Sequence, residues 1–198
     1  MMTTDLAEAT DGEKLTAGMA DIYRFLAQSM EYPDAAWLTP DYWTFLHTML
    51  TDLGWQEEIS TLSSLLASPD TVSDHLASLQ IEYTRLFINA VPHVIAPPYG
   101  SVYLSPDGTV YGQNSVRTLT FYREHGFDLA SETEIPDYLG CELEFLATLM
   151  DRDQPEEEKR FLEALFRPWF EIFRDRVLLE SQQPYYAILV RLIDFFTS

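Results

Sequence analysis

Histidines, a cysteine and closely spaced carboxylates are the residues here that could bind a metal or support catalysis. No two histidines lie within one turn of helix of each other, so the chain offers no i, i+4 pair for a metal. A di-iron bundle needs Glu-x-x-His steps on facing helices, and the sequence has none. We therefore expect no metal site. The histidines are His47, His75, His93 and His125.

The single cysteine, Cys141, excludes an intrachain disulfide and a thiolate-rich zinc site, and it is typical of a reducing compartment. It lies in an apolar helical stripe, where a thiol is more often inert core than a nucleophile. Glu142 and Glu144 fall on different faces of that helix. Phosphate-binding, dinucleotide-binding and nucleophile-elbow motifs are also missing from the sequence. These residues give no positive evidence for catalytic residues or for a cofactor, and they leave an enzyme without local motifs open. The expectation that the chain is not an enzyme comes from the family resemblance described below.

The stretch Ala96–Leu104, Ala-Pro-Pro-Tyr-Gly-Ser-Val-Tyr-Leu, points instead to binding. Pro97 and Pro98 fix φ and lack N–H groups, so the run is not a helix interior. Gly100 permits a close approach or a positive φ. A rigid surface that carries two aromatic rings suits peptide recognition. A buried interdomain loop is the alternative that these residues leave open.

The charge and hydropathy of the chain limit the classes of partner that it can bind. The formal net charge is −20, from 32 acidic and 12 basic residues, which argues against nucleic acid and against anionic lipid. A basic partner is the natural complement, unless the acidity serves only solubility. The N-terminus Met1–Glu8 lacks the features of a signal peptide, and no apolar run approaches the ~20 residues that cross a bilayer. We expect a cytoplasmic, soluble protein without membrane insertion.

Helical periodicity dominates the chain and predicts an all-α fold. We expect a single helical-bundle-like domain of about eight or more helices, with a long Pro/Gly-rich central loop. Residues 1–12 are expected to be disordered, and residues 13–198 to form the domain. Its predicted parts are an N-terminal lobe (13–88), the central loop (89–114) and a C-terminal lobe (115–198).

Three local features sharpen this outline. Val102–Leu104 and Thr109–Tyr111 flank Ser-Pro-Asp-Gly, which predicts a short hairpin or two extended pieces that do not pair. Gly54 and Gly126 are expected to end helices. Pro168 lies inside an apolar helical stripe, so a kink or break is expected nearby.

Three segments together resemble the TorD/DmsD/NarJ family of cytoplasmic chaperones for molybdenum enzymes. The first is Ala96–Leu104 followed by Gly-Gln-Asn-Ser at 112–115, which is most similar to the DmsD branch. The second is Pro-Asp-Tyr at 136–138, which leads into a Glu-Leu-Glu-Phe-Leu helix. The third is Arg-Pro-Trp at 167–169 with Pro-Tyr-Tyr at 184–186. The resemblance covers most of the chain from Glu82 onward.

The resemblance implies an all-α chaperone that binds the twin-arginine signal peptide of an apo-oxidoreductase related to DMSO reductase. Such a chaperone holds the precursor in the cytoplasm until the molybdopterin cofactor is inserted, and only then is the precursor exported. The family's peptide-binding positions correspond to Tyr99, Gly112, Asp137 and Tyr138. The predicted set also includes Pro98, Ser101, Tyr103 and Gln113 from the same region.

Two positions depart from the family pattern. Tyr138 stands in place of a histidine, which removes a switchable proton but keeps a hydroxyl and a flat ring. Gln113 stands at or beside an aspartate of the DmsD branch, which removes a carboxylate. The identity of the client enzyme therefore stays open.

Physical chemistry is compatible with such a client. A basic n-region and an apolar h-region call for carboxylates beside an apolar groove, because guanidinium pairs best with carboxylate. Asp137 is one candidate, and a helix-capping aspartate is its other interpretation. The competing functions are a helical small-molecule-binding protein or cryptic enzyme with a loop-covered pocket, and a scaffold subunit. A monomer and a lobe-exchanged homodimer are both compatible with the sequence.

Overall fold

The computed structural model describes residues 11–67, 72–90, 93–131 and 133–198, and within these it is all-α, as predicted. Most of residues 1–12, the segment expected to be disordered, lies outside the described residues, and the first helix begins at Asp11. The helices are α1 (Asp11–Ser29), α2 (Pro40–Asp52), α3 (Gln56–Leu66), α4 (Val72–Tyr83), α5 (Gly100–Leu104), α6 (Gln113–Glu124), α7 (Leu139–Asp151), α8 (Pro155–Phe161), α9 (Arg167–Glu180) and α10 (Pro184–Phe196), with π-helical turns η1 (Thr84–Ile88) and η2 (Leu162–Phe166).

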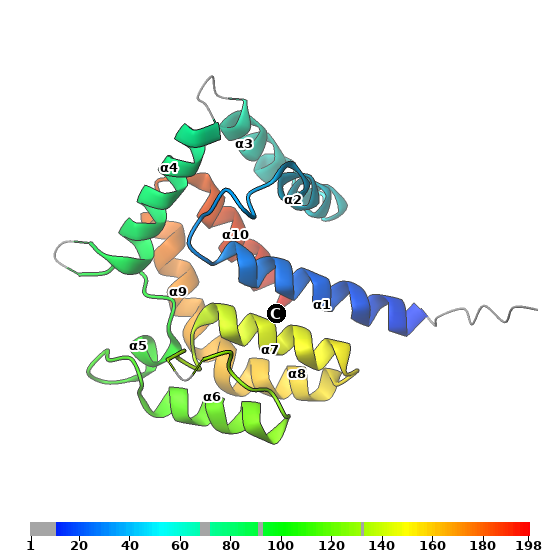
Figure 1. Cartoon of the computed structure of the whole chain (residues 1–198), viewed down its shortest axis with the longest axis vertical. Coiled ribbons are helices and arrows are strands. Elements are labelled where there is room, and N and C mark those ends of the chain that lie inside the picture. Colours follow the sequence, from blue (N-terminus) through cyan, green and yellow to red (C-terminus); the bar gives the residue numbers. More distant parts are fainter. Residues whose placement is uncertain (1–10, 68–71, 91–92, 132) are drawn as a thin grey trace, which may run out of the picture.

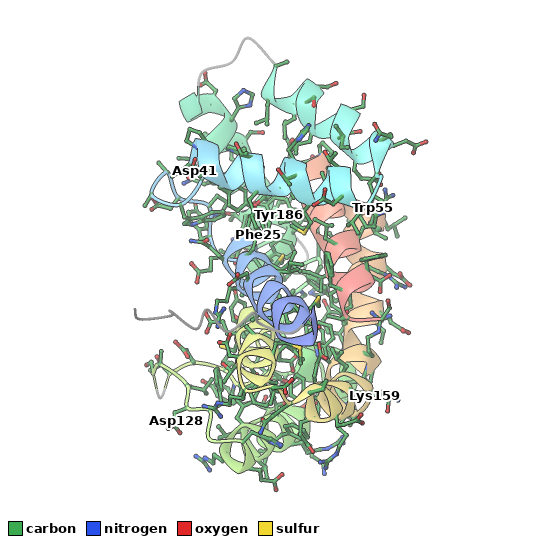
Figure 2. All side chains as sticks on the ribbon, turned by 90° about the vertical axis from the view of Figure 1, so that its right-hand side faces the viewer. Phe25, Asp41, Trp55, Asp128, Lys159 and Tyr186 are labelled. Atoms are coloured by element: carbon green, nitrogen blue, oxygen red, sulfur yellow. The ribbon has the colours of Figure 1, made fainter. Side chains whose placement is uncertain are left out.

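The helices form two groups that share elements. Figure 1 shows α2, α3 and α4 at one end of the molecule and α5, α6, α7 and α8 at the other, with α9 and α10 running between them. Helix α1 crosses the middle and packs along α7. Side chains fill the interior between the two groups (Figure 2). None of the helices in the described residues is long and apolar enough to cross a membrane.

Helix α7 is the centre of the core. Leu143, Leu146 and Leu149 are fully buried, and so is Phe145 on another face. A helix that is apolar on nearly all sides must be surrounded by other elements. Helix α10 is similar, and its Tyr185 and Tyr186 reach back to the N-terminal helices.

Hydroxyl groups tie α10 to those helices. The Oη atoms of Tyr185 and Tyr42 lie 2.5 Å apart, and Tyr186 Oη donates to the Leu79 carbonyl at 2.8 Å. The predicted N-terminal and C-terminal lobes therefore interlock through α1 and α10.

The predicted ends of helices are confirmed at two glycines. Gly54 and Gly126 have φ of +72° and +62°, which only glycine adopts freely. The predicted break near Arg167 is a π-helical turn, η2, which directly precedes α9 and its Pro168. The wider turn accommodates a residue that lacks the N–H and would clash with the preceding turn.

The predicted hairpin in the central loop is wrong. Gly100–Leu104 forms the short helix α5, and Thr109–Tyr111 contains no strand. Val102, Tyr103 and Leu104 are too short a run to distinguish a strand from a helix. The helix forms because partners distant in the sequence hold its first turn, as described below.

Candidate functional site

The diproline segment is joined to the chain just before α7 through backbone contacts. The carbonyl of Pro98 accepts a hydrogen bond from Leu139 N at 3.0 Å, and the carbonyl of Asp137 accepts one from Gly100 N at 2.9 Å. Tyr99 and Tyr138 therefore form an isolated antiparallel bridge. Two of the three segments that carry the family resemblance thus meet here, although they are far apart in the sequence.

Asp137 is fully buried at the centre of this junction. Its Oδ2 accepts from Ser101 N at 2.6 Å and from Asn114 Nδ2 at 3.4 Å, while its Oδ1 accepts from Ser115 Oγ at 2.6 Å. Ser101 is in the first turn of α5, and Asn114 and Ser115 are in the first turn of α6. Asp137 therefore holds the first turns of α5 and α6 together. The hydrogen bonds that it accepts compensate the free-energy cost of burying its carboxylate. In this arrangement it does not face a guanidinium from solvent.

Gly100 and Gly112 lie where the surrounding atoms leave no room for a Cβ atom. A Cβ on Gly100 would lie 2.6 Å from Asn114 Nδ2 and 2.9 Å from Trp169 Cδ1. A Cβ on Gly112, the residue before α6, would overlap Ser105 Oγ. Pro98 and Ser101 are buried beside them. These four residues therefore determine the path of the backbone, and other residues form the surface.

Trp169, from the third segment of the resemblance, closes the inner side of this region. Its Nε1 donates to Glu142 Oε2 at 3.1 Å, and both residues are fully buried. Burial and the nearby Asp137 raise the pKa of Glu142 well above its usual range, although the Trp169 hydrogen bond opposes this. The buried environment of Glu142 therefore favours its neutral, protonated form. Cys141 is also buried, and desolvation followed by the nearby carboxylates Glu134, Glu144 and Glu142 raises its pKa to about 12, so it is a poor nucleophile.

Tyr99 and Tyr138 face outward only in part, and they belong to a larger aromatic surface. Their ring centroids lie 5.5 Å apart. Tyr138 Oη and Tyr83 Oη both donate to the Met30 carbonyl, at 2.9 and 3.0 Å. The ring of Tyr32, which is 48% exposed, packs edge-on against Tyr83 at 5.5 Å. We refer to Tyr32, Tyr83, Tyr99 and Tyr138 as the tyrosine band.

Burial disfavours ionisation of three hydroxyl groups in this band, those of Tyr83, Tyr99 and Tyr138. Burial raises the pKa of Tyr83 to about 12, and it raises the pKa values of Tyr99 and Tyr138 as well. The two partly exposed members, Tyr99 and Tyr138, therefore present flat rings without formal charge.

Three carboxylates lie around the band. Partial desolvation raises the pKa of Glu144 above its usual value, and the nearby charges of Glu31 and Glu134 add to this effect. Glu31 also acts on Tyr83, and Glu134 and Glu144 act on Cys141, which places all three beside the start of α7 and the band. None of the three forms an ion pair within the described part of the chain. We refer to Glu31, Glu134 and Glu144 as the acidic rim.

A cleft of about 420 Å³ adjoins the junction on the α6 side. Tyr111, with φ of +63°, crosses this region, and its hydroxyl donates to the Thr133 carbonyl at 3.3 Å. Both acidic and basic side chains line the cleft. The lining residues are Tyr111, Ser115, Val116, Leu119, Arg123, Asp128, Leu129, Ser131, Glu134 and Pro136.

The structure thus separates the predicted site residues. Tyr99 and Tyr138 reach the surface together, whereas Tyr103 stacks on Trp169 at 5.8 Å, with the Arg176 guanidinium 4.9 Å from its ring. Gln113 is exposed at the start of α6. The remaining four, Pro98, Ser101, Gly112 and Asp137, form the supporting junction.

The acidic rim was not predicted from the sequence. Glu31, Tyr32 and Tyr83 carry no local signal that marks them as site residues. To find these residues, one would need to know that the segment after α1 packs beside α4 and α7.

Comparison with known proteins finds relatives of this chain in sequence and in structure. The family model described as "Nitrate reductase delta subunit" matches residues 50–175. The Tat proofreading chaperone DmsD of Salmonella typhimurium is 28% identical over 140 residues, which cover 70% of this chain and 67% of that protein. The chaperone protein TorD of Psychrobacter sp. is 26% identical over 164 residues, which cover 76% and 74%. A crystal structure described as a redox enzyme maturation protein from Archaeoglobus fulgidus has a TM-score of 0.57 at 28% identity and covers both chains fully.

Proposed function

We propose, from the premise that this chain belongs to the nitrate reductase delta subunit family, that it is a chaperone for the maturation of a molybdenum oxidoreductase. It binds the twin-arginine signal peptide of the apo-enzyme in the cytoplasm and delays export until the cofactor is inserted. The curated relatives support this proposal, because they are named as chaperones rather than as enzymes.

The acidic rim beside the tyrosine band is the observation that carries the proposal for the site. Partial burial raises the pKa of Glu144, and the nearby charges of Glu31 and Glu134 raise it further. No ion pair within the described residues neutralises the three carboxylates. A pair of guanidinium groups relieves this repulsion and pairs with carboxylates in a bidentate geometry. The rings of Tyr99 and Tyr138 offer flat surfaces for the same groups. The arginine pair of the signal peptide therefore binds here.

Asp137 positions the residues of the site and does not itself contact the peptide. It is buried, and it fixes the backbone that carries Tyr99 and Tyr138. We assign it, with Pro98, Ser101 and Gly112, to positioning the site.

Isothermal calorimetry with a synthetic twin-arginine leader peptide tests the proposal. The double variant Glu31→Gln/Glu144→Gln should weaken binding by about 1–3 kcal/mol, since two charge-assisted contacts are lost. The matched control, Glu57→Gln/Glu156→Gln, removes the same charge at exposed positions on α3 and α8 and should change affinity little. Equal losses in both variants would show that only net charge matters. Failure of the wild-type protein to bind several leaders would reject the proposed function.

A further inference from the structure

A second, strongly apolar groove lies between α2, α3 and α4, away from the motif. It encloses about 240 Å³. One polar side chain lines it, His75, whose Nε2 is buried without a hydrogen-bond partner among the described residues. The lining residues are Ala35, Leu38, Pro40, Trp43, Leu66, His75, Leu76 and Leu79.

The groove is embedded in the least basic part of the chain. Between Phe25 and Thr84 the sequence holds nine acidic residues and no lysine or arginine. Asp34 and Asp41, each adjacent in sequence to a lining residue, are exposed and form no ion pair within the described ranges. Figure 2 shows Asp41 toward one end of the long axis and Lys159 toward the other. An apolar groove in acidic surroundings selects an apolar segment that lies next to positive charge.

The groove continues the tyrosine band along α4. Leu79 is one turn before Tyr83 on the same face of the helix, and Leu76 is about two turns before it. Gln80 Nε2 donates to the Pro33 carbonyl at 2.8 Å, so the segment that follows Glu31 and Tyr32 is held against α4. Two turns of helix are about 10 Å, a distance that an extended peptide spans in about three residues.

We propose that this groove binds the apolar segment that follows the arginine pair of the signal peptide. The inference rests on the proposed function and extends it, because it adds a second subsite about two turns of α4 away from Tyr83 of the tyrosine band. The cleft beside α6 is less suited to this segment, since three charged side chains, Arg123, Asp128 and Glu134, line it. A second copy of this chain is disfavoured as occupant, because two chains of net charge −20 repel each other.

Adjacent exposed alanines supply a matched test. Ala35 lines the groove, whereas Ala36 is outside it. Ala35→Lys places a long charged side chain at the groove, and Ala36→Lys adds the same charge one residue away. Calorimetry compares three peptides: the complete leader, the leader with its apolar segment replaced by Gly/Ser, and the leader with both arginines changed to Gln. Thermal melts verify that both variants stay folded.

We expect Ala35→Lys to weaken binding of the complete leader about tenfold more than Ala36→Lys does, a difference that corresponds to about one fully desolvated apolar contact. The Gly/Ser leader should bind both variants equally. Equal affinity of the variants for the complete leader would overturn the groove assignment while the proposed function stands. A selective loss in Val116→Lys, at the cleft beside α6, would also overturn it. A wild-type protein that binds none of the leaders would overturn both proposals.

Discussion

The carboxylate of Asp137 accepts a hydrogen bond at 2.6 Å from the backbone N–H of Ser101, a residue 36 positions earlier in the chain. The contact explains why a loop that follows two prolines turns into the helix α5. Free N–H groups at a helix start need acceptors, and here the acceptor comes from another part of the chain. Asn114 and Ser115 complete the cluster from α6.

Removing this acceptor should destabilise the fold. We expect Asp137→Ala to lower the free energy of unfolding by about 2–4 kcal/mol, because it leaves several buried donors unpaired. Urea denaturation measures the loss. If Asp137→Ala leaves stability intact and abolishes peptide binding, Asp137 contacts the peptide directly and its assignment as a positioning residue is wrong.

Gly100→Ala should also be destabilising, by about 1–3 kcal/mol, because its Cβ would press on Asn114 and Trp169. Gly18→Ala is the control, since a Cβ there meets nothing within 4 Å and Gly18 lies inside α1. Helix propensity predicts that this control gains roughly 0.5–1 kcal/mol. Opposite signs in urea melts support the packing role of Gly100, and a neutral Gly100→Ala contradicts it.

The Met30 carbonyl offers a double-mutant cycle, because it accepts from both Tyr83 and Tyr138. Tyr83→Phe and Tyr138→Phe should each cost about 0.5–1.5 kcal/mol, since one donor remains. The double variant should cost more than the sum, because it leaves a carbonyl without either donor. Strict additivity in chemical denaturation would show that the two hydroxyls act independently.

The raised pKa of Glu142 should make the stability of the fold depend on pH. Its pKa in the folded protein lies well above the ordinary value of 4.5, mainly because it is buried. The stability that its neutral form provides is therefore fully present below pH 4.5 and is lost as the pH rises through the raised pKa. Glu142→Gln keeps an acceptor for Trp169 Nε1 and cannot ionise. Melting temperatures between pH 5 and pH 9 should fall less for Glu142→Gln than for the wild type, and parallel curves would contradict the assignment.

Much of this architecture could be predicted from the sequence. The helices, their glycine ends and the break at Pro168 follow from periodicity and backbone chemistry. The helix α5 could not be predicted, because its five residues are too few for a periodic signal and its capping acceptor is Asp137. The acidic rim escaped for a similar reason, since Glu31, Glu134 and Glu144 come from three separate segments.

The sequence also could not show which residues of the predicted binding loop reach the surface. Pro98, Tyr99 and Tyr103 are neighbours in sequence, yet Pro98 is buried, Tyr99 reaches the tyrosine band and Tyr103 packs on α9. Sequence identifies the motif. Only the fold separates the residues that support the surface from those that form it.

The packing of α1 along α7 has a consequence for biosynthesis. Helix α1 is synthesised before α7, so it leaves the ribosome without the helix along which it packs in the folded protein. Pairings so distant in sequence slow folding and leave nascent surface exposed to aggregation. The core of this chain therefore closes only after α7 has been synthesised.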